Sequence, residues 1–262
     1  NLSNSISMSK IINNPKISII TVVKNNENHI EKNILSVINQ TYKNYEHIIV
    51  DGNSSDGTLK IINKYRNKIS KIISEKDDGL YDAMNKGIKN ATGDIIGILN
   101  SDDYYYENAL NIVKKYFEKK PDLDFLYGSV IKHKHLYGYY PWKINWTFGF
   151  YTSHSVGFFI KKTSQFRVGL YNTKYKYSSD YDLFFRMIIK FKMKGISTKK
   201  NEILGYFSPS GLSSKIKYID YLNENTQIRL DNGQNKFLVK IIYFLRYMKR
   251  LKLILKQKKI NQ

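Results

Sequence analysis

Cysteine is absent from this 262-residue sequence, and its absence excludes several kinds of chemistry. Without a thiol the chain forms no disulfide, uses no thiolate nucleophile and builds no cysteine-based zinc site. No uncharged apolar run reaches 18 residues, so we expect no membrane-spanning helix. The first fourteen residues are polar and lack the apolar core of a signal peptide. Together these absences favour a cytoplasmic location, because the cytoplasm is reducing and its proteins rarely contain disulfides.

Acidic residues are scarce as well. The chain has 22 Asp and Glu against 43 Lys and Arg, which gives a formal net charge of +21 and a pI near 9.7. Such a surplus suggests an anionic partner: nucleic acid, an acidic membrane surface or a phosphorylated substrate. The alternative is a basic surface that only faces water.

What is present is an alternation of short apolar runs with segments of helical spacing. The runs predict strands at residues 16–23, 45–50, 71–74, 94–99, 125–130 and 158–161. Helical spacing predicts helices at residues 27–40, 59–65, 81–90, 109–119 and 182–191. Alternation of this kind predicts an α/β fold with a mostly parallel sheet and helices on both faces.

Polar clusters follow three of the predicted strands, at residues 24–27, 51–58 and 100–103. Ligands of parallel α/β sheets bind outside the carboxyl ends of the strands. The three clusters therefore predict one site at this edge of the sheet.

A dense acidic group also stands out in this basic chain. Six of the 22 acids fall between positions 77 and 103: Asp77, Asp78, Asp82, Asp94, Asp102 and Asp103. Like charges repel unless a positive charge lies among them, and a divalent cation such as Mg²⁺ or Mn²⁺ meets that need. Turn and cap roles are the alternative for most of them. Asp102 and Asp103 follow an apolar strand directly, which favours a functional role.

Four segments now carry a resemblance to a known family. They read PKISIITVVKNN, SVINQTYKNYEHIIVDGNSSDGT, SEKDDGLYDAMNKGIKNATGDIIGILNSDD and SSDYDLFFR, and they cover most of residues 15–186. In this order and spacing the sequence resembles the family-2 glycosyltransferases of the GT-A fold. It is most similar to bacterial enzymes that build capsule, the O-antigen of lipopolysaccharide, or exopolysaccharide.

The resemblance implies a set of donor contacts. Asp51 matches the aspartate that binds the uracil of a UDP-sugar, and Val23 to Asn25 match the first nucleotide-contacting turn. Relatives often carry a tyrosine where this chain has Lys24. Asp82 and Asn85 match donor-contacting positions. Met84 replaces the arginine of many relatives, which leaves Lys86 to face a phosphate.

The resemblance also implies a metal site. Asn100, Ser101 and Asp102 occupy the family's Asp-X-Asp position, with asparagine in place of the first aspartate. We expect Asp102 to bind Mn²⁺ or Mg²⁺ together with the donor's diphosphate. Ser101 belongs to the same donor-binding segment, and Asp103 is expected to support Asp102 or to contact the ribose.

On the acceptor side, Asp180 matches the aspartate of the family's Glu-Asp motif, with Ser179 in place of the glutamate. There the carboxylate serves as general base; the alternative is a helix N-cap. His154 is a candidate contact to the acceptor, the diphosphate or the metal, with a packed histidine as the alternative. Residues 211–214 resemble a flexible loop near the acceptor.

The resemblance implies inverting transfer of a sugar from a nucleotide-sugar, by family habit a UDP-sugar, to a glycan or lipid-linked glycan. Asn100 and Ser179 keep a catalytically inactive sugar-nucleotide-binding homologue as an alternative. A basic nucleic-acid-binding protein is a weaker one, because the strongest motifs are acidic or neutral. A nucleotidyltransferase is disfavoured, since residues 24–27 contain no glycine for a phosphate loop.

The predicted organisation is a polar leader (1–14), a catalytic domain (15–214) and a basic helical extension (215–262). Residues 236–259 hold nine Lys and Arg and no acid, with apolar residues at helical spacing. A basic amphipathic helix suggests peripheral docking on the anionic cytoplasmic face of the inner membrane. Packing on the catalytic domain and a partner protein are the alternatives.

Overall fold

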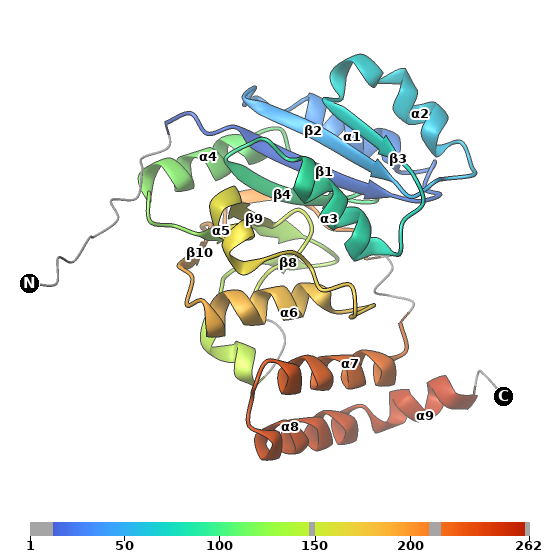
Figure 1. Cartoon of the computed structure of the whole chain (residues 1–262), viewed down its shortest axis with the longest axis vertical. Coiled ribbons are helices and arrows are strands. Elements are labelled where there is room, and N and C mark those ends of the chain that lie inside the picture. The colour runs from blue at the N-terminus through green and yellow to red at the C-terminus, as the bar shows by residue number, and fades with distance from the viewer. Residues whose placement is uncertain (1–12, 147–149, 210–215, 260–262) are drawn as a thin grey trace, which may run out of the picture.

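A seven-stranded sheet forms the centre of the molecule (Figure 1). The computed structural model describes residues 13–146, 150–209 and 216–259. Strand order in the sheet is β10-β6-β9-β4-β1-β2-β3. The strands are β1 (Ile17–Val23), β2 (Tyr45–Asp51), β3 (Lys71–Ser74), β4 (Ile95–Asn100), β6 (Phe125–Tyr127), β9 (Phe158–Lys161) and β10 (Gly195–Ser197). Only β9 pairs antiparallel with its neighbours β4 and β6, so the prediction of a mostly parallel sheet is confirmed.

Strand β1 is an interior strand of this sheet, between β4 and β2, and all seven of its residues are buried. Ile20 and Val22 belong to one apolar cluster, whereas Ile17 and Ile19 belong to another on the opposite face. A strand covered on both faces reads as a continuous apolar run, because neither face meets water.

Helices cover both faces of the sheet, as predicted. One face packs against α3 (Leu80–Asn90) and α6 (Ser179–Phe185), while the other packs against α4 (Ala109–Lys119). Helices α1 (Ile30–Ile38) and α2 (Thr58–Lys64) share a third cluster with β2. Gly87 brings α3 close to β1, since a Cβ there would lie 2.3 Å from the Ile20 side chain.

A second, smaller sheet was not predicted. Its order is β5-β11-β7-β8, and the strands are β5 (Tyr104–Tyr105), β7 (Ser129–Ile131), β8 (His135–Leu136) and β11 (Ile203–Tyr206). The single strand expected at residues 125–130 is therefore divided between two sheets. The break is at Gly128, where a Cβ would lie 2.0 Å from the Leu204 side chain, so only glycine lets β11 pack this closely.

The helix expected at residues 182–191 begins and ends earlier. It starts at Ser179 and continues after Phe185 as a wider π-type turn over Arg186–Lys190. The Phe191 N–H reaches back five residues to the carbonyl of Arg186, which closes this turn. Asp180 therefore lies in the first turn of α6, where a carboxylate interacts favourably with the helix dipole.

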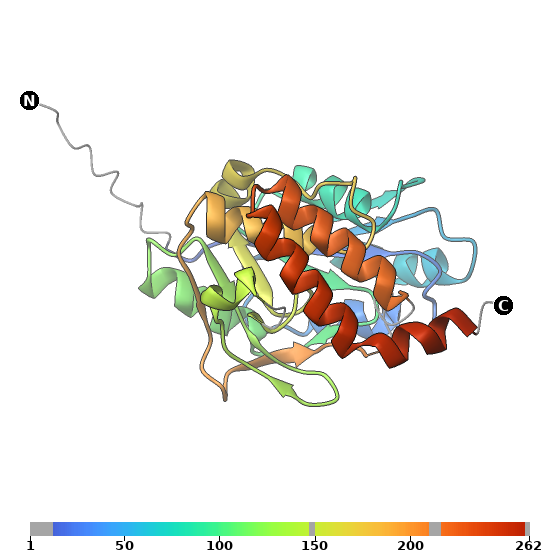
Figure 2. The same cartoon turned by 90° about the horizontal axis from the view of Figure 1, so that it is seen from below.

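Three helices form the C-terminal part of the described chain: α7 (Tyr218–Asp231), α8 (Lys236–Lys249) and α9 (Leu251–Lys259). Helix α7 packs on α6, and α8 lies beside α7 on the outside of the molecule (Figures 1 and 2). The buried Arg229 donates hydrogen bonds to the carbonyls of Ile144 and Asn145 in the short helix η2 (Pro141–Asn145). The first helix of the predicted extension is thus tied to the body of the protein, and the boundary at residue 215 stays a prediction.

Candidate active site

The loops that follow β1, β2 and β4 are joined to one another by hydrogen bonds. The Asn25 N–H donates to Ser54 Oγ at 2.8 Å, and Asn25 Oδ1 accepts from the Ser55 N–H at 2.8 Å. Asn25 has a φ of +50°, a left-handed conformation that asparagine tolerates well. Asn26 Nδ2 donates to Ser101 Oγ at 2.7 Å. The three polar clusters predicted to meet at the strand ends therefore do meet.

The loop after β3 also reaches this junction, through a close approach at Gly52. The Gly52 N–H donates to the carbonyl of Val23, the last residue of β1, at 2.9 Å. A Cβ at position 52 would lie 2.1 Å from Asp77 Oδ2, so any side chain there would displace the Asp77 carboxylate. Glycine at this position lets four strand ends approach one another.

Asp51, the predicted uracil contact, is fully buried at the end of β2. Its carboxylate accepts a hydrogen bond from Ser74 Oγ at 2.7 Å, and others from the N–H and hydroxyl of Ser54. In the structure Asp51 thus organises the turn after β2. Its contact with a donor base stays a prediction.

Three further predicted donor contacts, Asp82, Asn85 and Lys86, lie on α3, and each already contacts another residue of the protein. Lys86 Nζ lies 2.9 Å from Glu75 Oε1 and 3.3 Å from Asp82 Oδ2. The hydrogen bond to Glu75, followed by that to Asp82, raises the pKa of Lys86. Asn85 donates to the Tyr171 carbonyl at 2.9 Å and accepts from the Tyr171 N–H at 3.0 Å. Their roles toward a donor remain predictions.

Asp102 and Asp103 follow β4 and differ sharply in environment. Asp103 is buried, and its Oδ1 accepts from the Ser208 N–H at 2.7 Å. Its Oδ2 has no hydrogen-bond partner among the described residues. Burial, and then the charge of Asp102, raises the pKa of Asp103 to about 7. Asp102 is half-buried and accepts no hydrogen bond from any described residue, which leaves its carboxylate available to a ligand.

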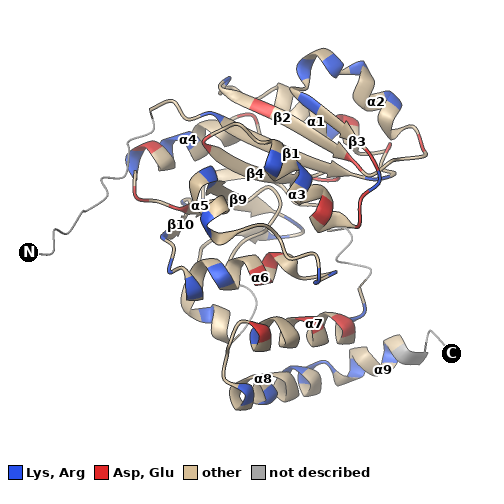
Figure 3. Cartoon of the chain, in the orientation of Figure 1, with Lys and Arg blue, Asp and Glu red and all other residues tan. Residues whose placement is uncertain are grey.

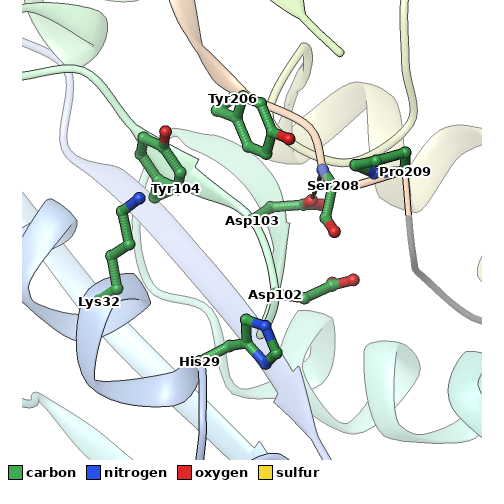
Figure 4. A pocket seen from close by; sticks show the side chains of 8 residues that line it. All are labelled: His29, Lys32, Asp102, Asp103, Tyr104, Tyr206, Ser208 and Pro209. Atoms are coloured by element: carbon green, nitrogen blue, oxygen red, sulfur yellow. Dashed lines mark hydrogen bonds between the residues drawn. The ribbon is translucent and has the colours of Figure 1, made fainter. Parts of the chain in front are cut away.

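A cavity of about 280 Å³ opens beside this pair (Figure 4). Its lining consists of His29, Lys32, Asp102, Asp103, Tyr104, Tyr206, Ser208 and Pro209. Tyr104 stacks on Tyr206 with ring centroids 5.2 Å apart, and Lys32 Nζ lies 3.6 Å from the Tyr104 ring centroid. Sequence reasoning missed His29, Lys32 and both tyrosines. Pairing of β11 with β5 brings Tyr206 to the site, and no local pattern announces that pairing.

A divalent metal would meet few protein ligands here. No group of three or more His, Asp or Glu side chains able to hold a metal occurs among the described residues. Asn100 Oδ1 is buried and has no hydrogen-bond partner among the described residues, and Asp102 lines the cavity. One carboxylate with one or two substrate phosphates is a common arrangement for Mg²⁺ and Mn²⁺. The residues present fit a metal that a bound diphosphate helps to hold.

Asp180 occupies a different environment, between the buried Tyr81 and the partly buried Tyr151. Its Oδ1 accepts from the Tyr81 hydroxyl at 3.1 Å, and its Oδ2 accepts from the Tyr151 hydroxyl at 3.3 Å. The helix N-cap is Ser178 rather than Asp180. Tyr81 belongs to the first turn of α3, next to Asp82, so Asp180 lies beside the helix predicted to contact the donor.

His154 lies close to the same tyrosines. Its Nε2 is 2.6 Å from the Tyr171 hydroxyl, and its ring packs against Phe158 and Phe184. Burial lowers the pKa of His154, although Asp180 opposes this effect. His154 is therefore packed and hydrogen-bonded inside the protein, and a direct ligand contact stays a prediction. The acceptor loop expected at residues 211–214 lies outside the described residues.

The sequence also matches a known protein family and several curated proteins. Residues 18–191 match the family described as glycosyl transferase family 2. An uncharacterized glycosyltransferase of Rickettsia prowazekii is 29% identical over an alignment 277 residues long, gaps included. The alignment covers 95% of this chain and 86% of that protein. One from Rickettsia typhi is 33% identical, over 66% of this chain and 59% of its own length, and one from Rickettsia conorii is matched over only 20% of its length.

Solved structures share the fold. Staphylococcus aureus TarS in complex with UDP-GlcNAc matches with a TM-score of 0.68 and 17% identity, over 89% of this chain and 73% of that one. A mannosyltransferase from Pyrobaculum calidifontis, in complex with GDP-Man and Mn²⁺, matches with a TM-score of 0.64 over 89% of this chain and 69% of that one. At these identities the likeness establishes the fold.

Proposed function

The chain belongs to glycosyl transferase family 2, and from this premise we propose that it transfers a sugar from a UDP-sugar to a glycan or lipid-linked glycan, with inversion. The observation that carries the proposal is the junction of the loops after β1, β2 and β4, beside a cavity that contains Asp102. We assign the pathway to bacterial surface polysaccharide synthesis, and we expect the enzyme to act in the cytoplasm.

The donor half of the proposal uses the strand ends. Ligands of parallel α/β sheets bind at this edge, and here Asn25 and Ser101 are already held in place by neighbouring loops. We assign Val23, Asn25, Asp51, Asp82, Asn85, Lys86, Ser101, Asp102 and Asp103 to the donor side. Solved relatives of the same fold bind UDP, UDP-GlcNAc or GDP-Man, which supports a nucleotide-sugar donor.

Asp102 is the residue we assign to a Mn²⁺ or Mg²⁺ ion. Such an ion, when bound, offsets the negative charge of the departing diphosphate. The half-buried carboxylate of Asp102 faces the cavity, while the buried Asp103 holds the Ser208 backbone and so fixes the chain that borders it.

Asp180 is the residue we assign as general base. In this reaction the acceptor oxygen bonds to the anomeric carbon, the bond from that carbon to the diphosphate oxygen breaks, and the hydroxyl proton passes to Asp180. Hydrogen bonds from Tyr81 and Tyr151 hold both carboxylate oxygens in place for this transfer. We assign His154 to the acceptor or diphosphate side.

The test is isothermal titration of the full chain with UDP, GDP and dTDP, with and without Mn²⁺. We expect saturable, metal-dependent binding of UDP that Asp51→Ala abolishes, because the turn after β2 depends on this carboxylate. Asp220→Ala, which removes an exposed carboxylate of α7, is the matched control and should bind normally. Absence of binding to all three nucleotides would contradict the proposal.

The inactive-homologue alternative makes a separate prediction. A chain that only binds sugar nucleotides would bind UDP in the same titration but would neither transfer sugar nor hydrolyse the donor slowly. Nucleotide release from a UDP-sugar panel, followed with and without Mn²⁺, separates the two outcomes.

A further inference from the structure

Helix α8 presents an exposed apolar stripe on the outside of the molecule. The stripe, here called the outer stripe, consists of Phe237, Ile241, Phe244, Leu245 and Met248. These positions recur at i, i+4, i+7, i+8 and i+11, which puts them on one face of the helix. Phe237 is 74% exposed, and Phe244 and Leu245 are each 60% exposed. Contiguous exposed apolar surface of this kind usually marks a binding face.

The opposite face of α8 packs on the rest of the protein. Val239 and Ile242 are buried where α8 meets α7, and both lie away from the outer stripe around the helix. Helix α8 is therefore apolar on two sides. Packing on the catalytic domain, one alternative for residues 236–259, explains the side of Val239 and Ile242. It leaves the outer stripe without a partner among the described residues.

Cations border the outer stripe, and neither α8 nor α9 contains an acidic residue. Lys240 and Lys249 are exposed on its two flanks. Arg250, between α8 and α9, and Lys252 and Lys256 on α9 are exposed as well. Asp231 is the last acidic residue of the chain. Figure 3 shows basic residues along α8 and α9 and acidic ones on α7 and α6. The charge of this surface is therefore of one sign.

An exposed tryptophan lies next to this helix. Arg246 Nη2 of α8 donates to the Trp146 carbonyl at 3.3 Å, and Trp146 is 55% exposed. Tryptophan is enriched at the boundary between lipid and water, because its ring is apolar and its N–H is polar. None of the described helices is long and apolar enough to cross a membrane.

We propose that the outer stripe and its bordering cations dock the protein on the surface of an anionic lipid bilayer. Apolar side chains of an interfacial helix enter the boundary between headgroups and acyl chains, while Lys and Arg meet anionic headgroups. A second copy of this chain would bring like charges together, which opposes self-association through this face. Helix α7 lies between α8 and α6 (Figure 1). Docking through α8 therefore holds the proposed base Asp180 on the side of the leaflet that carries a lipid-linked acceptor; this last step rests on the proposed function.

The test is sedimentation of the full chain with phospholipid vesicles in the absence of donor. One set is phosphatidylcholine alone, and in the other about a third of the lipid is phosphatidylglycerol. We expect saturable binding to the anionic set, weakened by added salt, and little binding to the neutral set.

Two double variants divide the surface into its parts. Lys240→Gln/Lys249→Gln should weaken binding to anionic vesicles about 30-fold, because each cation near the surface contributes to the attraction. Phe244→Ser/Leu245→Ser should weaken it about tenfold or more, because both side chains then stay in water. Matched controls remove the same groups elsewhere: Lys60→Gln/Lys68→Gln on and beside α2, and Phe166→Ser on α5 (Lys162–Val168).

Equal binding by the variants and their controls, or no binding to anionic vesicles, would overturn the proposal. So would a dimer in solution that Phe244→Ser/Leu245→Ser dissociates, since that result assigns the outer stripe to a second copy. UDP titration of the same preparations keeps the two proposals apart. A chain that binds UDP but not vesicles loses only the docking surface, and one that binds vesicles but not UDP loses the proposed function.

Discussion

The strand-end region and the tyrosine-lined region hold their functional carboxylates in different ways. At the strand ends, backbone N–H groups and small polar side chains such as Asn25, Asn26 and Ser54 link one loop to the next. Around Asp180, the donors are the hydroxyls of Tyr81 and Tyr151, whose rings are packed among other aromatic side chains. Local turn chemistry therefore shapes the first region, whereas packing of large rings shapes the second.

This difference separates binding from turnover. Asp102 is open to the cavity and has no hydrogen-bond partner in the described chain, so its charge is available to a ligand. Asp180 has a donor on each oxygen, so its position is fixed before any acceptor arrives. Loss of Asp102 should affect donor binding and turnover together, and loss of Asp180 should affect turnover alone.

The largest expected effect is that of Asp102→Ala. Turnover should fall about 10³-fold or more, because the charge of the departing diphosphate is no longer offset. Metal-dependent UDP binding should disappear with it, as measured by titration with and without Mn²⁺. Retained metal-dependent binding would move the metal away from Asp102 and remove one side of the comparison.

Asp180→Asn should lower kcat about 10²-fold or more while UDP binding stays unchanged. An amide keeps the shape of the side chain but accepts no proton, and Tyr81 and Tyr151 still surround it. Steady-state kinetics and UDP titration of the same preparation check both halves of the expectation, with Asp220→Asn as the exposed control. Wild-type turnover would leave the tyrosine-lined region with a structural role only.

Glu46 provides a carboxylate of a third kind, buried and away from both regions. Burial raises its pKa, but hydrogen bonds from Ser18 and Thr92 and the nearby Lys16 outweigh this and lower it to about 2. A lowered pKa adds stability above about pH 4.5, and that stability is lost as pH falls toward 2.

Glu46→Gln should therefore reduce the free energy of unfolding at neutral pH by about 2 kcal/mol, with catalysis unchanged. Urea unfolding of both proteins across a pH series measures the effect. The gap between wild type and variant should narrow as the solution is acidified from about 4.5 toward 2. A gap independent of pH would mean that packing, and not ionisation, is responsible.

The smallest expected effect is that of Tyr151→Phe. Loss of one hydroxyl that donates to Asp180 should lower kcat about tenfold, since a hydrogen bond to a charged group is worth roughly 1.5–3 kcal/mol. Tyr247→Phe on α8 is the control, and UDP binding should be unaffected in both. An equal fall in donor affinity would mean that the two regions are not separable.

The sequence predicted most of the first region and little of the second. Apolar runs bounded by polar turns predicted β1 to β4, and the carboxyl ends of parallel strands necessarily meet, so Asn25, Asp51 and Asp102 could be grouped in advance. The second sheet could not be predicted, because β5 and β8 have two residues each and the pairing of β11 with β5 is distant in sequence. Tyr206 was missed for that reason. Lys32 was missed because its place over the Tyr104 ring depends on the packing of α1 against β5.

The tyrosines around Asp180 were missed for another reason. Tyr81 and Tyr151 are 99 and 29 residues from Asp180 in the chain, and tyrosine is so common here that a single one carries little information. Tyr81 comes from α3 and Tyr151 from the chain before β9, and the two meet Asp180 of α6 only in the folded protein. The resemblance could identify the carboxylate, but the side chains that hold it depend on the tertiary structure.

The paired hydrogen bonds between Asn85 and the Tyr171 backbone have a consequence for amide exchange. Tyr171 lies outside any helix or strand, where backbone amides commonly exchange with solvent hydrogen within moments of exposure. Its N–H, however, is buried and bonded to the Asn85 side chain on α3. Deuterium should therefore enter this loop position about as slowly as it enters the central strands, because both must wait for the same opening of the structure.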